Sequence, residues 1–394
     1  MNDFDFYKKD ANTLVCNKIS DCYVDLNNYI KEEGIIKDSR IGKTFEVLNF
    51  KTVIKQPLSR CLVAQNRNAN IFFHLAESLW IFSGRNDLEF INLFNSRFKE
   101  YSDDGISLHG AYGERLRFWK TLNGESFLDQ LFLNTAMLAK DPNTRRSVFS
   151  LWNPLLDLEN QSRDIPCNIQ LAIKIHENDL YLTIFNRSND LHWGFVADIF
   201  QFSFMGEIIA LLLNKNFIAQ THLSQSLHIY QNNELISSIE QTNIHCSFFS
   251  KYKPSPFLFT FENSISNFSE RFNEIDMIFK DLNNSIIQKS RETTRIELDD
   301  ILSFSIQYKN KSQSVFEIAF LLFLSLSFKK SMEVTINKDN LRCEYADFLI
   351  HVWKIHRFVH ADYHALALNY FVRRISYQSL KLKYIEKDSN IGQY

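Results

Sequence analysis

Hydrophobic residues recur at helical spacing over several stretches of the chain. Within residues 11–33 they lie three to five positions apart and a glycine follows, which predicts an amphipathic helix that stops there. The same spacing predicts two helices within residues 71–98, joined at residues 83–86, and another over residues 127–139. Residues 195–213 are apolar almost all round, which is typical of a helix buried in the middle of a domain.

Short β-rich runs lie between these helices. Residues 44–54 alternate well enough to predict a half-buried strand. Residues 146–152, 167–175 and 180–185 predict three more strands, and the Glu-Asn-Asp sequence between the last two predicts a hairpin turn. A final strand-like run, FLFTF, covers residues 257–261.

The pattern changes again at about residue 262. From there to the end strand signals thin out and helical periodicity dominates, so we place a domain boundary at that point. The longest apolar stretch, residues 318–328, is too short to cross a bilayer, and we expect a buried helix there.

Three histidines, His356, His360 and His364, follow one another at steps of four in the C-terminal region. On a continuous helix they would share one face, and a pair four residues apart is a usable metal site. The two outer ones would lie about 12 Å apart at 1.5 Å per residue, too far for one ion. We therefore favour helix packing over metal binding for this segment.

Composition narrows the class of protein. The 394 residues are 45% hydrophobic and 23% charged, which predicts a globular chain of roughly two domains, or of one large domain with an appendage. The net charge of −2 gives no global field for nucleic acid or an anionic membrane, so an anionic ligand needs a local cluster of cations. Six scattered cysteines without a CxxC pair, and an acidic start, predict a cytoplasmic protein with free thiols.

Cys167 is the first candidate for chemistry. It follows an Ile-Pro pair at the start of a predicted strand, and a lone cysteine there is usually a small buried hydrophobe. Several arginines and Ser188 lie close to the predicted strands. The simplest interpretation of any one of these arginines is a solvated surface charge. Several guanidiniums and a hydroxyl that converge would bind a phosphate, and neighbouring cations would also favour the thiolate of Cys167.

Six motifs then occur in order: AESLWIFSGRND, ISLHGAYGERLR, RRSVFSLWNP, DIPCNIQ, FNRSNDLHWGFVADIFQFS and LHIY. Together they resemble the thymidylate synthase superfamily, which includes the nucleotide hydroxymethylases. The resemblance covers about residues 23–262 and implies an α/β (α+β) catalytic domain with a central mixed β-sheet that dimerises. Residues 1–22 would form a helical lead-in and residues 263–394 a mainly helical extension.

The resemblance implies a role for each matching residue. Cys167 matches the nucleophile that adds to carbon 6 of a pyrimidine. Glu77 matches a carboxylate that orders water, and Tyr112 a residue involved in removing the proton of carbon 5. The family's phosphate ligands correspond to Arg40, Arg145, Arg146, Arg187 and Ser188, with Arg145 and Arg146 reaching the site of the partner in a homodimer.

Further positions concern the sugar and the cofactor, 5,10-methylenetetrahydrofolate. His228 and Tyr230 match the contacts to the sugar hydroxyls. Asp190 matches the ligand of the pterin ring, and Gly194 allows close approach beside the ligand. Phe98 and Tyr101 take the places of two tryptophans of the synthases, and smaller side chains there favour entry of water.

Asp198 departs from the synthases, which carry asparagine at this position. A carboxylic acid can donate to ring nitrogen 3 of cytosine and accept from its exocyclic amine, whereas an amide suits uracil. Aspartate here is typical of the cytidylate hydroxymethylases. Family members also usually place a histidine directly after the nucleophile, where this chain has Asn168.

The resemblance therefore implies transfer of a one-carbon unit to carbon 5 of CMP or dCMP, with water completing a hydroxymethyl product. Two alternatives stay open. One is methylation of a pyrimidine nucleotide as in the synthases, and the other is a nucleotide-binding regulatory protein on a retired enzyme scaffold. The sequence does not distinguish ribose from deoxyribose.

Overall fold

The structure of the chain is a computed structural model. It describes residues 5–6, 12–39, 42–62, 67, 69–120, 126–232, 254–261, 267–292, 296–356 and 358–372.

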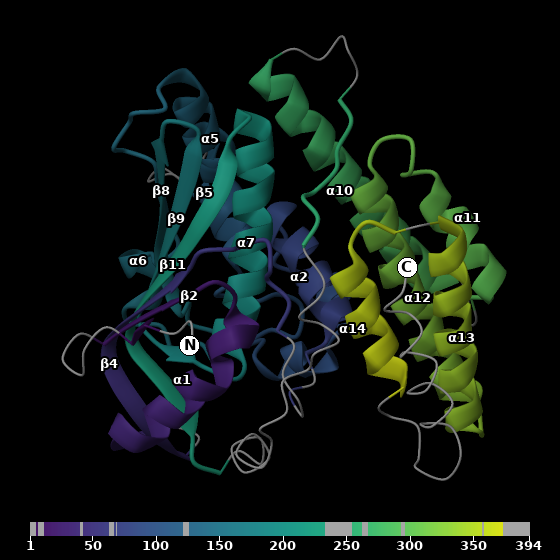
Figure 1. Cartoon of the computed structure of the whole chain (residues 1–394), viewed down its shortest axis with the longest axis horizontal. Helices are drawn as coiled ribbons and strands as arrows, with labels where there is room; N and C mark the ends of the chain where they lie inside the picture. The colour runs from purple at the N-terminus through teal and green to yellow at the C-terminus, as the bar shows by residue number, and fades with distance from the viewer. Residues whose placement is uncertain are drawn as a thin grey trace.

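A mixed β-sheet forms one side of the described molecule (Figure 1). Its main path runs β1-β2-β4-β11-β9-β8-β7, with β3 added to β4 and β10 added to β11. The long strand β11 is antiparallel to β4 and parallel to β9, and β9 and β8 form an antiparallel hairpin. Within the described residues the sheet has nine strands, β1 Asp5–Phe6, β2 Thr13–Cys16, β3 Ile35–Ser39, β4 Gly42–Ile54, β7 Val148–Ser150, β8 Asn168–His176, β9 Asp179–Asn186, β10 Asn189–Asp190 and β11 Asn216–Tyr230.

Helices cover one face of this sheet and continue into a second, all-helical region (Figure 1). Two short strands, β5 Trp119–Lys120 and β6 Phe127–Leu128, form a separate antiparallel pair and lie between two of these helices in the sequence. The helices are α1 Ile19–Glu33, α2 Ile71–Phe82, α3 Leu88–Ile91, the 3-10 helix η1 Ser96–Glu100, α4 Tyr112–Arg117, α5 Gln130–Lys140, α6 Pro154–Asp157, α7 Gly194–Leu213, α10 Phe268–Glu292, α11 Leu298–Ile306, α12 Gln313–Val334, α13 Lys338–His356 and α14 Ala361–Val372.

Helix α7 is the centre of the fold. It lies against β11 on one side and against α2 on the other, and most of its side chains are buried. Its length and apolar composition would also suit a membrane span. However, 83% of its most apolar 18-residue segment is buried inside the protein, as in the core helix of a globular domain. Burial on all sides explains why the sequence shows no polar face over this helix.

Most of the predicted elements are confirmed. The structure has the strand β4, the hairpin β8–β9, the helix α2 and the buried helix α12 over the apolar stretch 318–328. The first predicted helix starts later than expected, because the residues before α1 form β2. The FLFTF run is not a strand: the backbone N–H groups of Phe257 and Leu258 donate to the side chains of Glu207 and Ser314.

The expectation that three histidines share one helix is wrong. Helix α13 ends at His356, and α14 begins at Ala361. The carboxylate of Glu317 accepts hydrogen bonds from the backbone N–H groups of Val359 and His360, which starts a new helix there. The residues that the structure describes contain no group of three metal-binding side chains.

Helix packing is confirmed for the same segment. His364 is fully buried and stacks on Phe358 with ring centroids 3.8 Å apart. Tyr363 contacts Phe200 of α7, and Phe371 contacts Phe72 of α2. The helical region is thus joined to the sheet domain through the two helices at its centre, and the boundary at residue 262 stays a prediction.

Candidate active site

Cys167 lies at the end of a loop, directly before β8, and is the one exposed cysteine among those that the structure describes. Arg187 fastens this loop from the end of the neighbouring strand β9. Its backbone N–H donates to the carbonyl of Cys167 at 2.9 Å, and its guanidinium donates to the carbonyls of Pro166 and Ile165 at 2.8 and 3.0 Å. The hairpin β8–β9 therefore holds a cation on the loop that carries an accessible thiol.

Asp198 lies on α7 behind this loop and is almost fully buried. Three asparagine amides surround its carboxylate: Asn168 donates to Oδ1 at 2.9 Å, and Asn186 and Asn189 donate to Oδ2 at 3.3 Å. Burial raises the pKa of Asp198 to about 7, while the bonds from Asn168 and Asn189 act to lower it. The carboxyl can thus change protonation near neutral pH.

The amide of Asn168 has its orientation fixed by a second hydrogen bond. Asn186 donates its Nδ2 to Oδ1 of Asn168, and Ser224 donates to Oδ1 of Asn186 at 3.4 Å. The NH₂ group of Asn168 therefore faces Asp198. Because Asn168 follows Cys167 directly, one strand end positions both the thiol and the group that contacts Asp198.

Glu77 and Tyr112 complete the buried part of this cluster. Gln201, one turn after Asp198 on α7, donates to the carboxylate of Glu77 on α2. Burial raises the pKa of Glu77 to about 8, and the charges of Asp198 and Asp164 add to this increase. The hydroxyl of Tyr112 accepts a hydrogen bond from the backbone N–H of Asn168 at 3.3 Å, and burial raises the pKa of Tyr112.

Two of the four positions matched to the cofactor, Asp190 and Gly194, lie near the start of α7. Asp190, on β10, accepts a hydrogen bond from the backbone N–H of His192 at 2.7 Å, and burial raises its pKa to about 6. Trp193 is 53% exposed and has the guanidinium of Arg67 over its ring at 5.2 Å. A Cβ at Gly194 would lie 3.1 Å from Oδ1 of Asn189, so the glycine permits this close approach.

These residues fit the binding of a pterin. Nε2 of His192 and Oδ1 of Asn189 are buried and have no hydrogen-bond partner in the described structure, so polar groups are available beside Asp190. Of the two residues expected to replace tryptophans, Phe98 is partly buried against Phe73 and Tyr101 is 49% exposed. An exposed indole and a carboxyl next to each other can hold a flat, polar heterocycle.

The predicted sugar and phosphate residues are only partly assembled in one chain. His228 and Tyr230 are two residues apart on β11 with ring centroids 5.4 Å apart, and burial lowers the pKa of His228. Ser188 is half-buried between β9 and β10. Arg145 and Arg146 are exposed before β7, and Arg40 lies outside the described residues.

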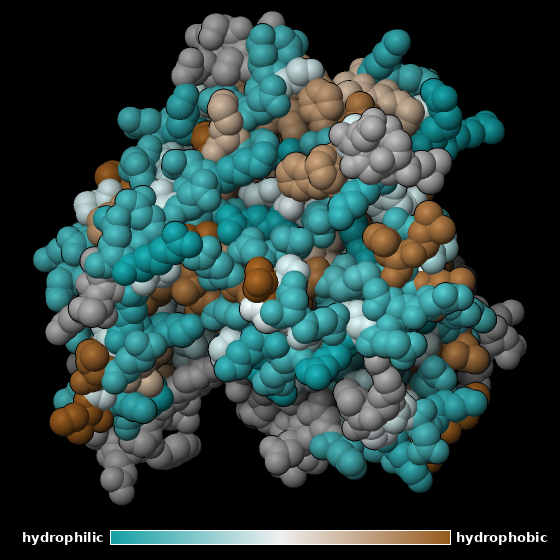
Figure 2. Space-filling model, turned by 180° about the vertical axis from the view of Figure 1, so that it is seen from behind, coloured by the Kyte–Doolittle hydropathy of each residue, from teal (hydrophilic) through white to brown (hydrophobic). Residues whose placement is uncertain are grey.

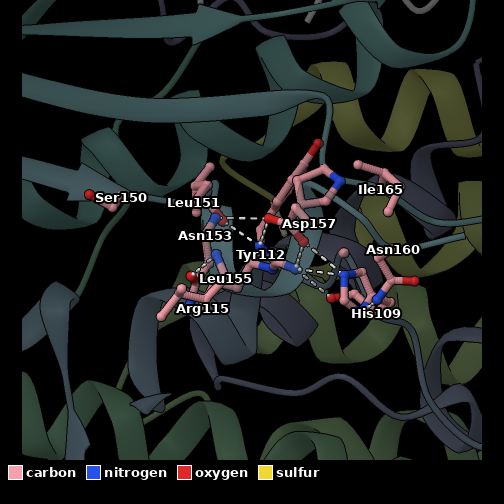
Figure 3. Close-up of polar contacts among 12 residues, drawn as sticks. His109, Tyr112, Arg115, Ser150, Leu151, Asn153, Leu155, Asp157, Asn160 and Ile165 are labelled. Atoms are coloured by element: carbon pink, nitrogen blue, oxygen red, sulfur yellow. Dashed lines mark hydrogen bonds and ion pairs between the residues drawn. The ribbon is translucent and has the colours of Figure 1, made fainter. Parts of the chain in front are cut away.

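A second polar cluster lies next to the cysteine loop, and sequence reasoning missed it (Figure 3). Arg115 of α4 donates from both terminal nitrogens to the buried carboxylate of Asp157, at 2.6 and 2.8 Å. His109 lies 2.7 Å from the same carboxylate, which also accepts from the backbone N–H of Asn153. This cluster fixes the segment before Tyr112 against the segment that leads to Cys167.

Other site residues were also missed in the sequence. Asn186, Asn189 and Gln201 contact the predicted acids, but each is an ordinary polar residue in its strand or helix pattern. Asp164 gave the clearest available signal, an acid three residues before the candidate nucleophile.

Comparison with known proteins identifies the family. The sequence model described as thymidylate synthase matches residues 21–294, which is more than half of the chain. The chain therefore belongs to the thymidylate synthase family, and the predicted family and fold class are confirmed. The match extends beyond residue 262 and includes helix α10.

Several curated proteins are similar to this chain. The deoxyuridylate hydroxymethyltransferase of Bacillus phage SP01 is 37% identical over 224 residues, which are 55% of this chain and 58% of that protein. The deoxyuridylate hydroxymethyltransferase of Pseudomonas phage M6 is 40% identical over 202 residues, which are 50% and 56% of the two chains. The thymidylate synthase of Symbiobacterium thermophilum is 30% identical over 167 residues, which are 40% and 58%. The chain thus spans less than two thirds of the length of these relatives.

Proposed function

We propose that this protein hydroxymethylates carbon 5 of a pyrimidine nucleoside monophosphate, with CMP or dCMP preferred and 5,10-methylenetetrahydrofolate as the one-carbon donor. The observation that carries the proposal is the direct connection between an exposed thiol and a buried acid. Cys167 lies beside Arg187, and the next residue, Asn168, holds the carboxylate of Asp198.

Each residue has a physical task in this reaction. The thiolate of Cys167 adds to carbon 6, which makes carbon 5 nucleophilic, and the cation of Arg187 favours that thiolate. Asp198 contacts the edge of the base. Glu77 orders water, and Tyr112 assists removal of the proton at carbon 5, because both lie in the buried cluster around Asn168.

Bound beside Asp190 and Trp193, the folate supplies a carbon at the oxidation level of formaldehyde. Water then has to reach the methylene group that stays on carbon 5. The exposed Tyr101 and the partly buried Phe98 support access of water to this side of the site. The names of two relatives, deoxyuridylate hydroxymethyltransferases at 37% and 40% identity, support a hydroxymethyl product over a methyl product.

The choice of cytosine rests on Asp198. Its pKa of about 7 lets it donate a proton to ring nitrogen 3 while its other oxygen accepts from the exocyclic amine. Partial protonation of the ring also makes carbon 6 easier to attack.

Uracil is the second candidate, and two observations favour it. The relatives named above act on deoxyuridylate by name. The NH₂ groups of Asn168 and Asn189 also lie beside Asp198, and an amide NH₂ can donate to the carbonyl at carbon 4 of uracil.

We further propose that the protein acts as a cytoplasmic homodimer. Arg145 and Arg146 are exposed and make no hydrogen bond that fixes their guanidiniums within the described chain, which suits a role in the partner's phosphate site. Leu48, Val148 and Tyr181, on three strands of the sheet, are 44%, 40% and 37% exposed, which supports burial of sheet residues between two subunits.

The test is a competition among dCMP, CMP and dUMP, with 5,10-methylenetetrahydrofolate and product masses measured. We expect a hydroxymethyl product, formed fastest from one of the cytosine nucleotides, and a shift toward dUMP in Asp198→Asn. A methyl product would contradict hydroxymethylation. Turnover of dUMP alone, or an unchanged base preference in Asp198→Asn, would contradict the role of Asp198.

A further inference from the structure

Asp164 is a carboxyl in the site region that the proposed reaction has not yet used. It lies three residues before Cys167 in the loop that leads to the nucleophile. The backbone N–H of Gly110 donates to its Oδ2 at 2.8 Å, and its own N–H donates to the hydroxyl of Ser162 at 3.1 Å. The first bond fixes the carboxyl against the segment before Tyr112, and the second holds the backbone of the cysteine loop at Asp164.

Gly110 makes room for this arrangement. A Cβ at position 110 would lie 2.7 Å from the carbonyl oxygen of Asp164 and 3.1 Å from its Oδ2. Since side chains do not tolerate such distances to a backbone oxygen, the carboxyl can approach only because residue 110 is a glycine. Within the described residues no hydrogen bond is made to the second oxygen, Oδ1.

Asp164 also lies within electrostatic reach of the proposed catalytic groups. Its charge contributes to the raised pKa values of Glu77 and Tyr112. Burial raises the pKa of Asp164 itself, the bond from Gly110 lowers it, and the nearby His109 and Arg115 act in the same lowering direction. The charge of Asp103 raises it.

The cluster in Figure 3 holds these neighbours in place. Arg115 and His109 share the carboxylate of Asp157, so the two groups that act on Asp164 belong to a fixed network rather than to mobile surface side chains. Asp164 is thus a restrained carboxyl with one oxygen anchored and one oxygen left for a small ligand, which distinguishes it from an ordinary loop acid.

We propose that Asp164 is the general base for the attacking water in the hydroxymethyl transfer. The inference rests on the proposed function. The water oxygen bonds to the methylene carbon attached to carbon 5, the double-bond electrons move into the ring toward carbon 4, and the water proton passes to Asp164. The bond between Cys167 and carbon 6 then breaks, its electrons leave with sulfur, and the aromatic ring is restored.

The test measures how the methylene group is partitioned between two nucleophiles. A small thiol such as 2-mercaptoethanol ionises in solution and needs no base from the protein, so it competes with water for the same carbon. We expect Asp164→Asn to lower the ratio of hydroxymethyl to thioether product by on the order of 10²-fold, the range typical of a lost general base. Glu159→Gln, which removes an exposed carboxylate of the segment that leads to Cys167, should leave the ratio unchanged.

A second measurement shows whether the site is intact. Exchange of the carbon 5 hydrogen with solvent needs the nucleotide and Cys167 but not the water step, so Asp164→Asn should keep the wild-type exchange rate within a few-fold. A wild-type product ratio in Asp164→Asn would overturn the proposal, as would loss of exchange, because Asp164 would then serve an earlier step. A wild-type protein that gives no hydroxymethyl product would instead overturn the proposed function.

Discussion

The buried end of the candidate site and its exposed rim are built differently. At the buried end, the carboxylates of Glu77 and Asp198 accept hydrogen bonds from side chains that are held in a helix or strand. At the rim, Tyr101 and Trp193 are about half exposed. The difference teaches that, in the proposed function, reactivity would be set by a rigid polar network, whereas cofactor contact and access of water would depend on side chains that can change at little cost to folding.

The largest effect should come from Cys167→Ser. Serine is a far weaker nucleophile than a thiolate at neutral pH, so we expect turnover to fall by on the order of 10⁴-fold or more. Denatured wild-type protein should carry a covalent adduct with a 5-fluorinated cytidylate and the folate, and Cys167→Ser should carry none. Cys343→Ser, in the helical region, is the matched control and should form the adduct normally.

Glu77→Gln should have the next largest effect. It keeps the shape of the side chain but removes a carboxyl whose pKa of about 8 suits proton relay near neutral pH. We expect turnover to fall by about 10²-fold to 10³-fold while nucleotide binding changes little. Glu114→Gln, whose carboxylate accepts from Asn86 instead, is the control. Equal losses in both variants would mean that Glu77 has only a structural role.

Asp198→Asn should change how stability depends on pH. A folded pKa raised from 3.8 to about 7 means that Asp198 favours the folded state fully below pH 4 and loses that contribution as pH rises through 7. The free energy of unfolding in urea, taken as variant minus wild type, should therefore increase by up to about 4 kcal/mol between pH 4 and pH 8. A parallel pH dependence in the two proteins would show that Asp198 does not titrate in this window.

Trp193→Ala should have the smallest effect. It removes an exposed ring and its contact with Arg67, so we expect the KM for the folate to rise about 3-fold to 10-fold, equivalent to about 1 kcal/mol, with kcat within twofold. Leu158→Ala, also exposed, should leave both constants unchanged. A large loss of kcat in Trp193→Ala would place the rim among the rigid parts of the site.

Local pattern was enough to predict the elements that carry most of the candidate site. Helices α2 and α7 and the hairpin β8–β9 each have a periodicity that their own residues determine, so Glu77, Asp198 and Cys167 could be assigned to elements in advance. The family and the fold class followed from the motifs on those elements and are confirmed by the match to residues 21–294.

The long strand β11 shows why the rest could not be predicted. Its inward positions include Gln220, His222 and Ser224, all buried, so the alternation of apolar and polar residues is hidden. Its pairing partners, β4 and β9, lie far away in the chain. The amides of Asn186 and Asn189 beside Asp198 were missed for the same reason, because only the folded sheet and α7 bring them together.

The contact between Tyr363 of α14 and Phe200 of α7 makes substitutions in the two regions depend on each other. Phe200 is two residues from Asp198, so a change of volume in α14 is transmitted to the helix that holds the acid proposed to contact the base. Substitutions in the helical region would then be selected together with substitutions around the pocket. A helical region exchanged between two such proteins would need a compensating residue at position 200.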